Sequence, residues 1–360
     1  MEKEILEKEN IRVGISVGDI NGIGPEVILK SLRDNMILTD ITPVIYGSAK
    51  VLSYYKKGLG MHDFNYQSCR SGKDVVNKKV NVINVWSEEV KIEPGNANST
   101  GGTYAVKSLE AAVKDLAEGE IDVLVTAPFS KETVQKAGLN FPGHTEYLAD
   151  KSQVKEALMI LVSNELRVAL VTTHIPLKEV PTTLTKEKIL EKIEAFASSL
   201  KKDFGIVRPK IAVLGLNPHA GENGKLGTEE QEIIAPAIHQ AKSNGILAFG
   251  PFPSDGFFGS TARSKYDGVL SMYHDQGLTG FKAIAFEDGV NFTAGLPIVR
   301  TSPDHGTAFD IAGKNSASEL SFRSAIYLAV DVFKKRKLYK MMNENPLPIR
   351  KVESENERDN

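Results

Sequence analysis

The sequence predicts an α/β protein in which mostly parallel sheets are covered by helices. Short apolar runs alternate with longer amphipathic stretches from residue 11 onward, which is the order that β–α–β units produce. The apolar runs are rich in Val, Ile and Leu and show no strict alternation with polar residues. Strands of this composition are typical of a parallel sheet that is buried on both faces.

The individual elements follow from these two patterns. Apolar runs predict strands at 11–17, 42–47, 80–85, 121–127, 166–173, 210–216 and 247–252, and further strands within 280–286, 289–297 and 298–306. Amphipathic stretches predict helices at 24–34, 101–118, 185–202, 228–243 and 318–336. Thr185 is placed to cap the third of these helices. Its apolar stripe consists of Ile189, Ile193, Phe196 and Leu200.

The domain organisation is predicted from the absence of repeats and flexible linkers in the sequence. The chain has no internal repeat, low-complexity tract or Gly/Ser linker, so we expect two domains that are joined by several chain crossings. We expect a first α/β domain at 11–140 plus 300–345, carrying a loop at 304–315, and a second α/β domain at 141–299. Residues 346–360 are too polar to bury, and we expect a disordered tail there.

The composition limits the classes of function. The chain has 360 residues, and its 44 Lys and Arg nearly balance its 46 Asp and Glu, so nucleic acid is not an expected partner. Cys69 is the single cysteine, which excludes an internal disulfide and leaves His and carboxylates to hold any metal. The start of the chain is charged and no apolar run approaches the ~20 residues of a membrane span. We therefore expect a cytoplasmic protein that does not bind a membrane.

Polar and glycine-rich segments cluster at the carboxyl ends of the predicted strands, where open α/β sheets bind their ligands. In Gly18–Glu26 the glycines permit close approach of a ligand, although the spacing does not fit the dinucleotide fingerprint and an ordinary strand-to-helix turn would use the same residues. The segments 126–131 and 141–146 form a second group. There His144 and Thr145 open a helix and can bind an anion, while Thr145 could instead be only an N-cap.

Three histidines share one placement, because His174, His219 and His274 each follow an apolar strand. A lone His there is more often a hydrogen-bonded loop residue. Three on separate strands favour imidazoles that converge on one divalent metal with positions left open for substrate. Asp255 and Asp275 are acidic neighbours that could orient the imidazoles or transfer a proton, and each could instead cap a helix.

Charged and polar residues continue downstream. Lys282, Asn291 and Arg300 lie along the predicted strands or at their ends. A buried Lys or Arg is costly unless a phosphate or carboxylate pairs with it, so the pair indicates an anionic ligand, and surface positions are the alternative. The glycine-bounded loop 304–315 follows, where His305 could stack on an adenine ring and the backbone could follow a phosphate.

These segments carry a family resemblance. Gly18–Glu26, Phe141–Glu146 and Leu216–Glu222, together with YHDQGL and VNFTAGLPIVRTSPDHGTAFDIAG, resemble the 4-hydroxythreonine-4-phosphate dehydrogenase family of pyridoxal phosphate biosynthesis. GDxxGIGPE and HGTAxDIAGK also resemble the wider isocitrate and isopropylmalate dehydrogenase superfamily. The resemblance implies two α/β/α domains with mostly parallel sheets, an active site in the cleft between them, and a homodimer.

The resemblance also implies roles for individual residues. The metal ligands, in a site completed across the dimer interface, correspond to His174, His219 and His274. The substrate-binding residues correspond to His144, Thr145, Lys282, Asn291 and Arg300. The adenosine end of the cofactor NAD or NADP corresponds to His305, Gly306 and Asn315. Asp255 and Asp275 are the candidates for proton transfer.

The implied reaction is the NAD(P)-dependent oxidation of 4-phosphooxy-L-threonine at C3, followed by decarboxylation to 3-amino-2-oxopropyl phosphate. One divalent metal ion per active site, Zn, Co, Mn or Mg, would stabilise the alkoxide and the enolate, with Mg the poorer match for imidazole. Family members that oxidise D-threonate or D-erythronate 4-phosphate, or an aromatic cis-dihydrodiol, leave the substrate open. The alternatives from other classes are a metal-dependent hydrolase of a small phosphate ester and an acyl-transferring relative.

Overall fold

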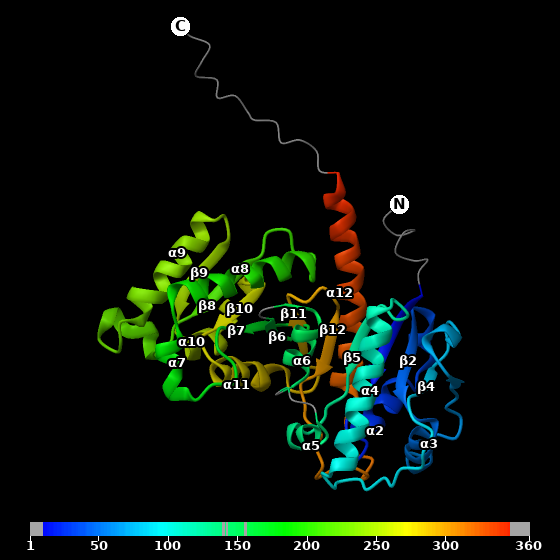
Figure 1. The fold of residues 1–360 in the computed structure, drawn as a ribbon. Helices are drawn as coiled ribbons and strands as arrows, with labels where there is room; N and C mark the ends of the chain where they lie inside the picture. The colour runs from blue at the N-terminus through cyan, green and yellow to red at the C-terminus, as the bar shows by residue number, and fades with distance from the viewer. Residues whose placement is uncertain (1–9, 139–140, 142, 155–156, 346–360) are drawn as a thin grey trace.

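A computed structural model describes residues 10–138, 141, 143–154 and 157–345. Its strands are β1 (Ile11–Ser16), β2 (Ile41–Gly47), β3 (Gln67–Cys69), β4 (Asn81–Asn84), β5 (Val123–Thr126), β6 (Leu158–Val162), β7 (Arg167–Leu170), β8 (Lys210–Leu214), β9 (Leu247–Phe252), β10 (Gly268–Ser271), β11 (Val290–Ala294) and β12 (Arg300–Pro303). Within the described residues these twelve strands form one sheet, in the order β3-β4-β2-β1-β5-β12-β11-β6-β7-β10-β8-β9. Figure 1 shows the sheet crossing the molecule from β4 and β2 on the right to β8 and β9 on the left.

Strand direction divides the sheet into three parts. The six strands from β3 to β12 are parallel, and so are β7, β10, β8 and β9 at the other end. Between these parts β11 is antiparallel to both β12 and β6, and β6 is antiparallel to β7. The predicted α/β class with a mostly parallel sheet is confirmed, and the two parallel parts meet at an antiparallel centre.

The helices cover the sheet. They are α2 (Gly24–Ser31), α3 (Ala49–Gly58), α4 (Ser99–Ala117), α5 (Lys131–Lys136), α6 (His144–Lys151), α7 (Val180–Thr183), α8 (Lys186–Lys202), α9 (Ala235–Ser243), α10 (Ser254–Phe258), α11 (His274–Ala285) and α12 (Leu320–Glu344). The five helices expected from amphipathic stretches are all present, with ends shifted by a few residues; the fourth begins as a π-helical turn at Glu230–Ile234 that leads into α9.

The apolar stripe predicted for α8 is confirmed. All four of its residues, Ile189, Ile193, Phe196 and Leu200, are fully buried. Thr185 caps the helix, because its hydroxyl accepts a hydrogen bond from the backbone N–H of Lys188 at 3.1 Å.

The strand expected within 280–286 is wrong, because these residues lie in and just beyond α11. Leu278, Phe281 and Ala285 are buried on one side of that helix, and their separations of three and four residues follow the helical period. The apolar run GFKAIAF therefore lies mostly in a helix that buries Phe281 and Ala285, and Lys282 projects from the same helix.

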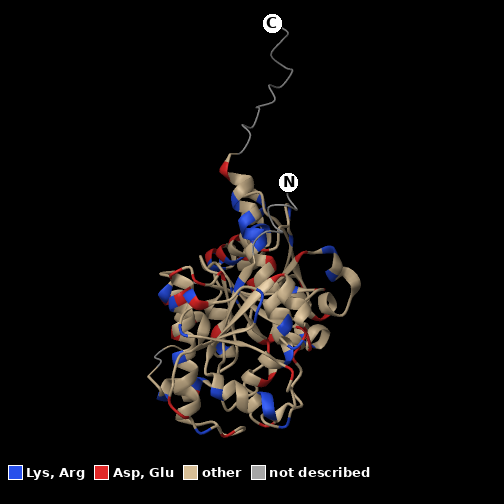
Figure 2. Cartoon of the chain, turned by 90° about the vertical axis from the view of Figure 1, so that its right-hand side faces the viewer, with Lys and Arg blue, Asp and Glu red and all other residues tan. Residues whose placement is uncertain are grey.

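The C-terminal helix joins the parts of the sheet. α12 packs on β12, β11, β5 and β1 and also contacts α2 and α8. Its last turns extend beyond the sheet (Figure 1), and Figure 2 shows several Lys and Arg positions, in blue, along this protruding part. The helix runs further than the predicted end at 336, to Glu344.

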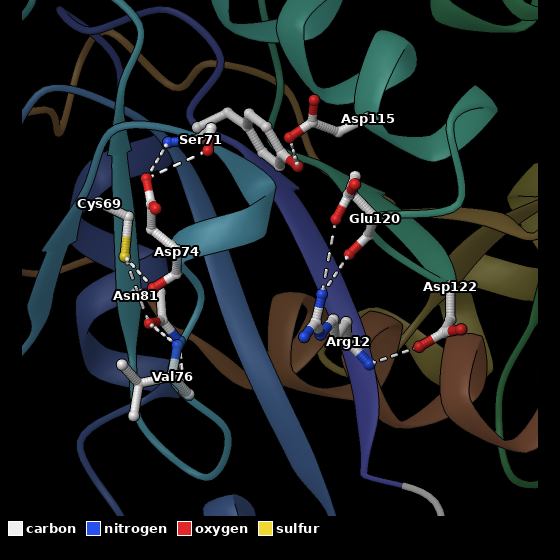
Figure 3. A network of polar contacts seen from close by, with 10 residues as sticks. Arg12, Cys69, Ser71, Asp74, Val76, Asn81, Asp115, Glu120 and Asp122 are labelled. Carbon is white, nitrogen blue, oxygen red and sulfur yellow. Dashed lines mark hydrogen bonds and ion pairs between the residues drawn. The ribbon is translucent and has the colours of Figure 1, made fainter.

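A polar network fastens the outer strands β3 and β4 (Figure 3). The side chain of Asn81 accepts a hydrogen bond from the backbone N–H of Val76 at 2.9 Å and donates to the carbonyl oxygen of Val76 at 3.0 Å. The thiol of Cys69 donates to the carbonyl oxygen of Asp74 at 3.4 Å. Cys69 is buried and free, so the single cysteine is a packing residue at the edge of the sheet.

The two predicted domains are 11–140 plus 300–345 and 141–299. This division stays a prediction, because one sheet runs through both of them. The boundary at 140 and the tail expected at 346–360 lie outside the described residues. None of the helices in the described part of the chain is both long and apolar enough to span a membrane.

Candidate active site

A cavity of about 390 Å³ lies where β5, β12, β11 and β6 meet the amino ends of α5, α6 and α11. Nine of the predicted site residues line it: His144, Thr145, His174, His274, Lys282, Asn291, Arg300, His305 and Gly306. Four others, His219, Asp255, Asp275 and Asn315, do not. The structure thus gathers residues that are up to 180 positions apart, from Thr126 at the end of β5 to Gly306 after β12, around one space.

Arg300 is the buried cation of this cavity. It begins β12 and is only 3% exposed, and its guanidinium donates hydrogen bonds to the hydroxyls of Thr126, at 2.6 and 3.1 Å, and Thr293, at 3.1 Å. Burial lowers the pKa of Arg300 to about 10, although the negative charge of Glu146 opposes this. No carboxylate in the described part of the chain lies within ion-pair distance of Arg300. A buried guanidinium bonded only to neutral hydroxyls is a binding group for an anion.

His144 and Thr145 are held by the first turn of α6. The imidazole of His144 stacks on Phe129, with ring centroids 3.7 Å apart. Burial, assisted by the positive charge of Arg300, keeps the pKa of His144 well below its usual range, so the ring is neutral near pH 7. Gly143 is the N-cap of α6, so the alternative that Thr145 serves only as the N-cap is wrong. This first turn lines the cavity together with Arg300, and the first N–H groups of a helix have no partner within the helix, so they are available to an anion.

The cavity also contains a second cation and two unpaired acceptors. The ammonium of Lys282 lies 3.5 Å from a carboxylate oxygen of Asp304, and burial raises the pKa of Asp304. Asn291 Oδ1 and His305 Nε2 are buried and have no hydrogen-bond partner among the described residues. His305 Nδ1 lies 3.0 Å from the carbonyl oxygen of Gly306, so it carries the proton and leaves Nε2 as an acceptor. A polar ligand in the cavity would satisfy both atoms.

Two of the three predicted metal ligands lie together. The rings of His174 and His274 have centroids 5.8 Å apart, and both line the cavity. His274 Nδ1 lies 2.6 Å from the carboxylate of Asp275, which fixes the imidazole and leaves Nε2 free, as in sites where a carboxylate orients a metal-bound histidine. Burial, followed by the charge of Lys131, lowers the pKa of His174 and favours the neutral form that binds metal. These residues fit two corners of a divalent metal site.

His219 is separate from that pair. It is exposed in the turn Pro218–Gly224 that follows β8, and α10 with its exposed Asp255 packs on this turn. Within the ranges that the structure describes, no three His, Cys, Asp or Glu side chains are grouped as a metal site in one chain. The single chain therefore assembles two of the imidazoles and leaves the third on its surface.

The glycine-rich segment Gly18–Glu26 fastens the loop that was expected to bind the cofactor. The backbone N–H of Ile23 donates to the carbonyl oxygen of Thr307 at 3.0 Å. The buried carboxylate of Glu26 accepts the backbone N–H of Ala317 at 3.0 Å and the ammonium of Lys30 at 2.7 Å. The motif thus has a definite structural task, which is to hold the loop beside the sheet.

That loop connects two cavities. His305 and Gly306 line the cavity described above, whereas Asn315 lines a second one of about 1220 Å³ together with Lys50, Tyr54 and Lys314. The side chain of Asn315 donates to the carbonyl oxygen of Gly58 at 2.8 Å. The cofactor residues predicted from the loop therefore divide between its two ends.

Sequence reasoning missed some lining residues. Glu146 lies in the first turn of α6 and its charge acts on both His174 and Arg300. Asp304 lies beside the ammonium of Lys282, and the hydroxyl of Thr126 accepts hydrogen bonds from Arg300. All three lie in segments that were selected because of other residues. Their position beside a predicted ligand is the sequence signal that could have identified them.

The fold and the cavity define an α/β protein with a polar pocket that fits a small anion. Comparison with known proteins gives the family. The family model described as "Pyridoxal phosphate biosynthetic protein PdxA" matches residues 39–329. A 4-hydroxythreonine-4-phosphate dehydrogenase of Bacteroides thetaiotaomicron is 52% identical over 343 residues, covering 95% of this chain and 94% of its own. The chain belongs to the PdxA family of 4-hydroxythreonine-4-phosphate dehydrogenases, which are oxidoreductases.

Two further comparisons bear on structure and substrate. The crystal structure of 4-hydroxythreonine-4-phosphate dehydrogenase from Klebsiella pneumoniae aligns with a TM-score of 0.77 and 36% identity, covering 90% of this chain and 98% of that one. A protein of Oceanobacillus iheyensis that is provisionally named D-threonate 4-phosphate dehydrogenase is 40% identical, covering 89% of this chain and 97% of its own. Membership of a dehydrogenase family disfavours the hydrolase and acyl-transfer alternatives.

Proposed function

We propose that this enzyme oxidises 4-phosphooxy-L-threonine at C3 with NAD or NADP, and that loss of the carboxylate as CO₂ then gives 3-amino-2-oxopropyl phosphate for pyridoxine phosphate synthesis. The observation that carries the proposal is the buried Arg300, which has no ion-pair partner in the described chain and faces a cavity beside two histidines. The substrate brings two anionic groups, and the cavity brings Arg300 and Lys282 to receive them.

The remaining substrate contacts are neutral. His144, held neutral by burial, and Thr145 in the first turn of α6 are placed to donate hydrogen bonds to an anion next to Arg300. Asn291 supplies an amide whose oxygen has no partner within the described residues. Phe129, Met159, Leu161 and Leu278 give the cavity an apolar wall that limits water around the reacting carbon.

The enzyme is proposed to use one divalent metal ion per site, Zn, Co, Mn or Mg. His174 and His274 would hold it, with His219 completing the set when two copies of the chain form a homodimer. Bound there, the ion supplies a Lewis acid for the C3 oxygen of the substrate. Asp275 orients His274 through its 2.6 Å contact. Asp255 lies in α10, which packs on the turn that carries His219. Its proposed role in proton transfer therefore also requires the second copy of the chain.

The nicotinamide cofactor is proposed to lie along the loop 304–315, from His305 and Gly306 in the substrate cavity to Asn315 in the second cavity. When bound, it accepts the hydride from C3. Ile23 and Glu26 hold this loop by hydrogen bonds at Thr307 and just beyond the loop at Ala317. These bonds would keep the two cofactor-binding ends of the loop at a fixed distance.

A second candidate function is the oxidation of D-threonate or D-erythronate 4-phosphate. The relative from Oceanobacillus iheyensis favours it, and both sugar acids carry the same phosphate and carboxylate as the threonine derivative.

The test measures reduction of NAD⁺ and NADP⁺ by the purified protein with added divalent metal. The substrates supplied in parallel are 4-phosphooxy-L-threonine and the two sugar-acid phosphates. Turnover of the threonine derivative supports the first proposal. Turnover of the sugar acids alone supports the second. Lack of turnover with all three substrates, or full activity after exhaustive chelation, would contradict the proposed site.

A further inference from the structure

The turn Pro218–Gly224 has an uncommon backbone. Four non-glycine residues in it adopt left-handed conformations, with φ of 53° at His219, 50° at Ala220, 42° at Glu222 and 57° at Asn223. L-amino acids disfavour this region because Cβ approaches the following carbonyl oxygen, and consecutive left-handed residues are rare outside glycine. Such strain persists only where the surrounding structure imposes it.

The carboxylate of Glu230 holds the two residues that lead into this turn. One oxygen, Oε1, accepts the backbone N–H groups of Leu216 and Asn217, both at 2.7 Å. The other, Oε2, accepts the side-chain amide of Asn217 at 3.0 Å. Glu230 is 2% exposed and begins the π-helical turn Glu230–Ile234, a rare form that is often found at functional sites.

Gln276 links the start of this turn to α11, the helix that begins at His274. The side chain of Gln276 donates to the carbonyl oxygen of Gly215 at 2.6 Å and accepts the backbone N–H of Met272 at 2.7 Å. Gly215 is closely packed in this network, because a Cβ there would lie 3.0 Å from both Glu230 Oε1 and the Cα of Ala220. The start of the His219 turn and the start of α11, with His274, are thus tied into one network.

We propose that Glu230 is a positioning residue for the metal site: its carboxylate keeps Pro218–Gly224 left-handed, and the left-handed turn presents the imidazole of His219 outward. The inference rests on the proposed role of His219 in metal binding. Glu230 itself touches neither substrate nor metal in this arrangement.

The experiment measures Co²⁺ affinity of the dimeric protein by competition with a chelator, beside thermal unfolding of the metal-free form. Glu230→Gln keeps the size of the side chain but places an amide N–H₂ opposite the amide of Asn217, where two donors face each other. We expect it to weaken Co²⁺ binding about tenfold or more, as outer-shell changes do. The matched control is Glu229→Gln, which removes a negative charge next to the same turn but keeps an oxygen that can accept from Asn217 Nδ2, 2.7 Å away in the native protein, and should keep near-native affinity.

Glycine substitutions in the turn test whether Glu230 acts on the conformation of the backbone. In Glu230→Gln with Ala220→Gly and Asn223→Gly, left-handed φ becomes accessible without the anchor, so we expect most of the lost affinity to return. If Glu230→Gln does not fold, Gly221→Ala gives a second measurement, since its Cβ would lie 2.6 Å from Glu230 Oε2 at a φ of 79° and should also weaken Co²⁺ binding.

The outcomes are distinguishable. Unchanged affinity in His219→Ala would remove the proposed metal role itself. Weak binding in His219→Ala with native binding in Glu230→Gln, or in Gly221→Ala, would overturn the role of Glu230. Failure of the two glycines to restore binding would overturn the conformational mechanism.

Discussion

Replacing Arg300 by Met should separate stability from substrate binding. The guanidinium is 3% exposed and bonded only to the hydroxyls of Thr126 and Thr293. Methionine removes the positive charge and keeps much of the side-chain volume. We expect the metal-free protein to remain folded while it loses affinity for the phosphorylated substrate.

The magnitude follows from burial. The pKa of Arg300 falls from its ordinary 12.5 to about 10. At about 1.4 kcal/mol per pKa unit, the folded state carries a penalty of about 3 kcal/mol for keeping this charge. Both states are protonated at pH 7, below both pKa values, so the penalty is fully present there. Loss of the hydrogen bonds to Thr126 and Thr293 offsets part of it. We expect the free energy of unfolding to stay constant or rise by up to about 2 kcal/mol.

The assay is urea denaturation of the substrate-free protein, paired with KM for the phosphorylated substrate. KM should rise at least about tenfold, because hydrogen bonds to a charged group contribute about 1.5–3 kcal/mol each. The matched control is Arg336→Met, since Arg336 lies 2.6 Å from the buried Asp203 and donates to the carbonyl oxygens of Leu296 and Ile298. Its removal leaves a buried carboxylate and should destabilise by about 3 kcal/mol.

The reasoning is refuted if Arg300→Met destabilises the protein as much as Arg336→Met does. It is also refuted if KM stays at the native value. Either result would mean that Arg300 is a structural residue whose charge is satisfied within the chain.

Three further predictions concern the same region. Asp275→Asn should weaken metal binding about tenfold in chelator competition and leave the unfolding temperature of the metal-free form unchanged, because Asp275 is exposed; a native affinity would exclude its orienting role. Burial and Arg300 hold the pKa of His144 below its ordinary 6.5, so below that pH the unfolded chain binds a proton that the folded chain does not, and stability falls as pH drops. Urea denaturation at pH 7.5 and 5.5 should show a smaller loss for His144→Asn than for the native protein, and equal losses would contradict the assignment. Ala220→Gly should raise the free energy of unfolding by about 0.5–1 kcal/mol, since glycine adopts left-handed φ without strain; a decrease would mean that the turn is not left-handed in solution.

The periodicity of the sequence was enough to predict the fold class and most elements. Where it failed, the reason is local. The run GFKAIAF was assigned to a strand, yet Phe281 and Ala285 are buried at helical spacing and Lys282 projects into the cavity from a helix. Short apolar runs do not distinguish a buried strand from the buried face of a helix.

Nine residues that line the candidate site were predictable from the sequence, but the separation of His219 from them was not. His174, His219 and His274 look equivalent in the sequence, since each follows a strand. The structure pairs the first and third and leaves His219 exposed in a turn with four left-handed non-glycine residues, and the buried Glu230 holds the residues that lead into this turn. Backbone handedness of this kind has no signature in the pattern of apolar residues. Glu230 itself was missed because a single glutamate in a helical stretch reads as a surface residue.

The place of β12 in the sheet affects how the protein is made. β12 inserts between β5 and β11, and its residues are the last of the sheet to leave the ribosome. Until then the growing chain holds β5 as an open edge, with unpaired N–H and C=O groups on strongly apolar residues. The cover over that edge, α12, comes later still. Synthesis that stalls before residue 300 would therefore leave an aggregation-prone fragment, and we expect this protein to depend on chaperones more than its balanced charge suggests.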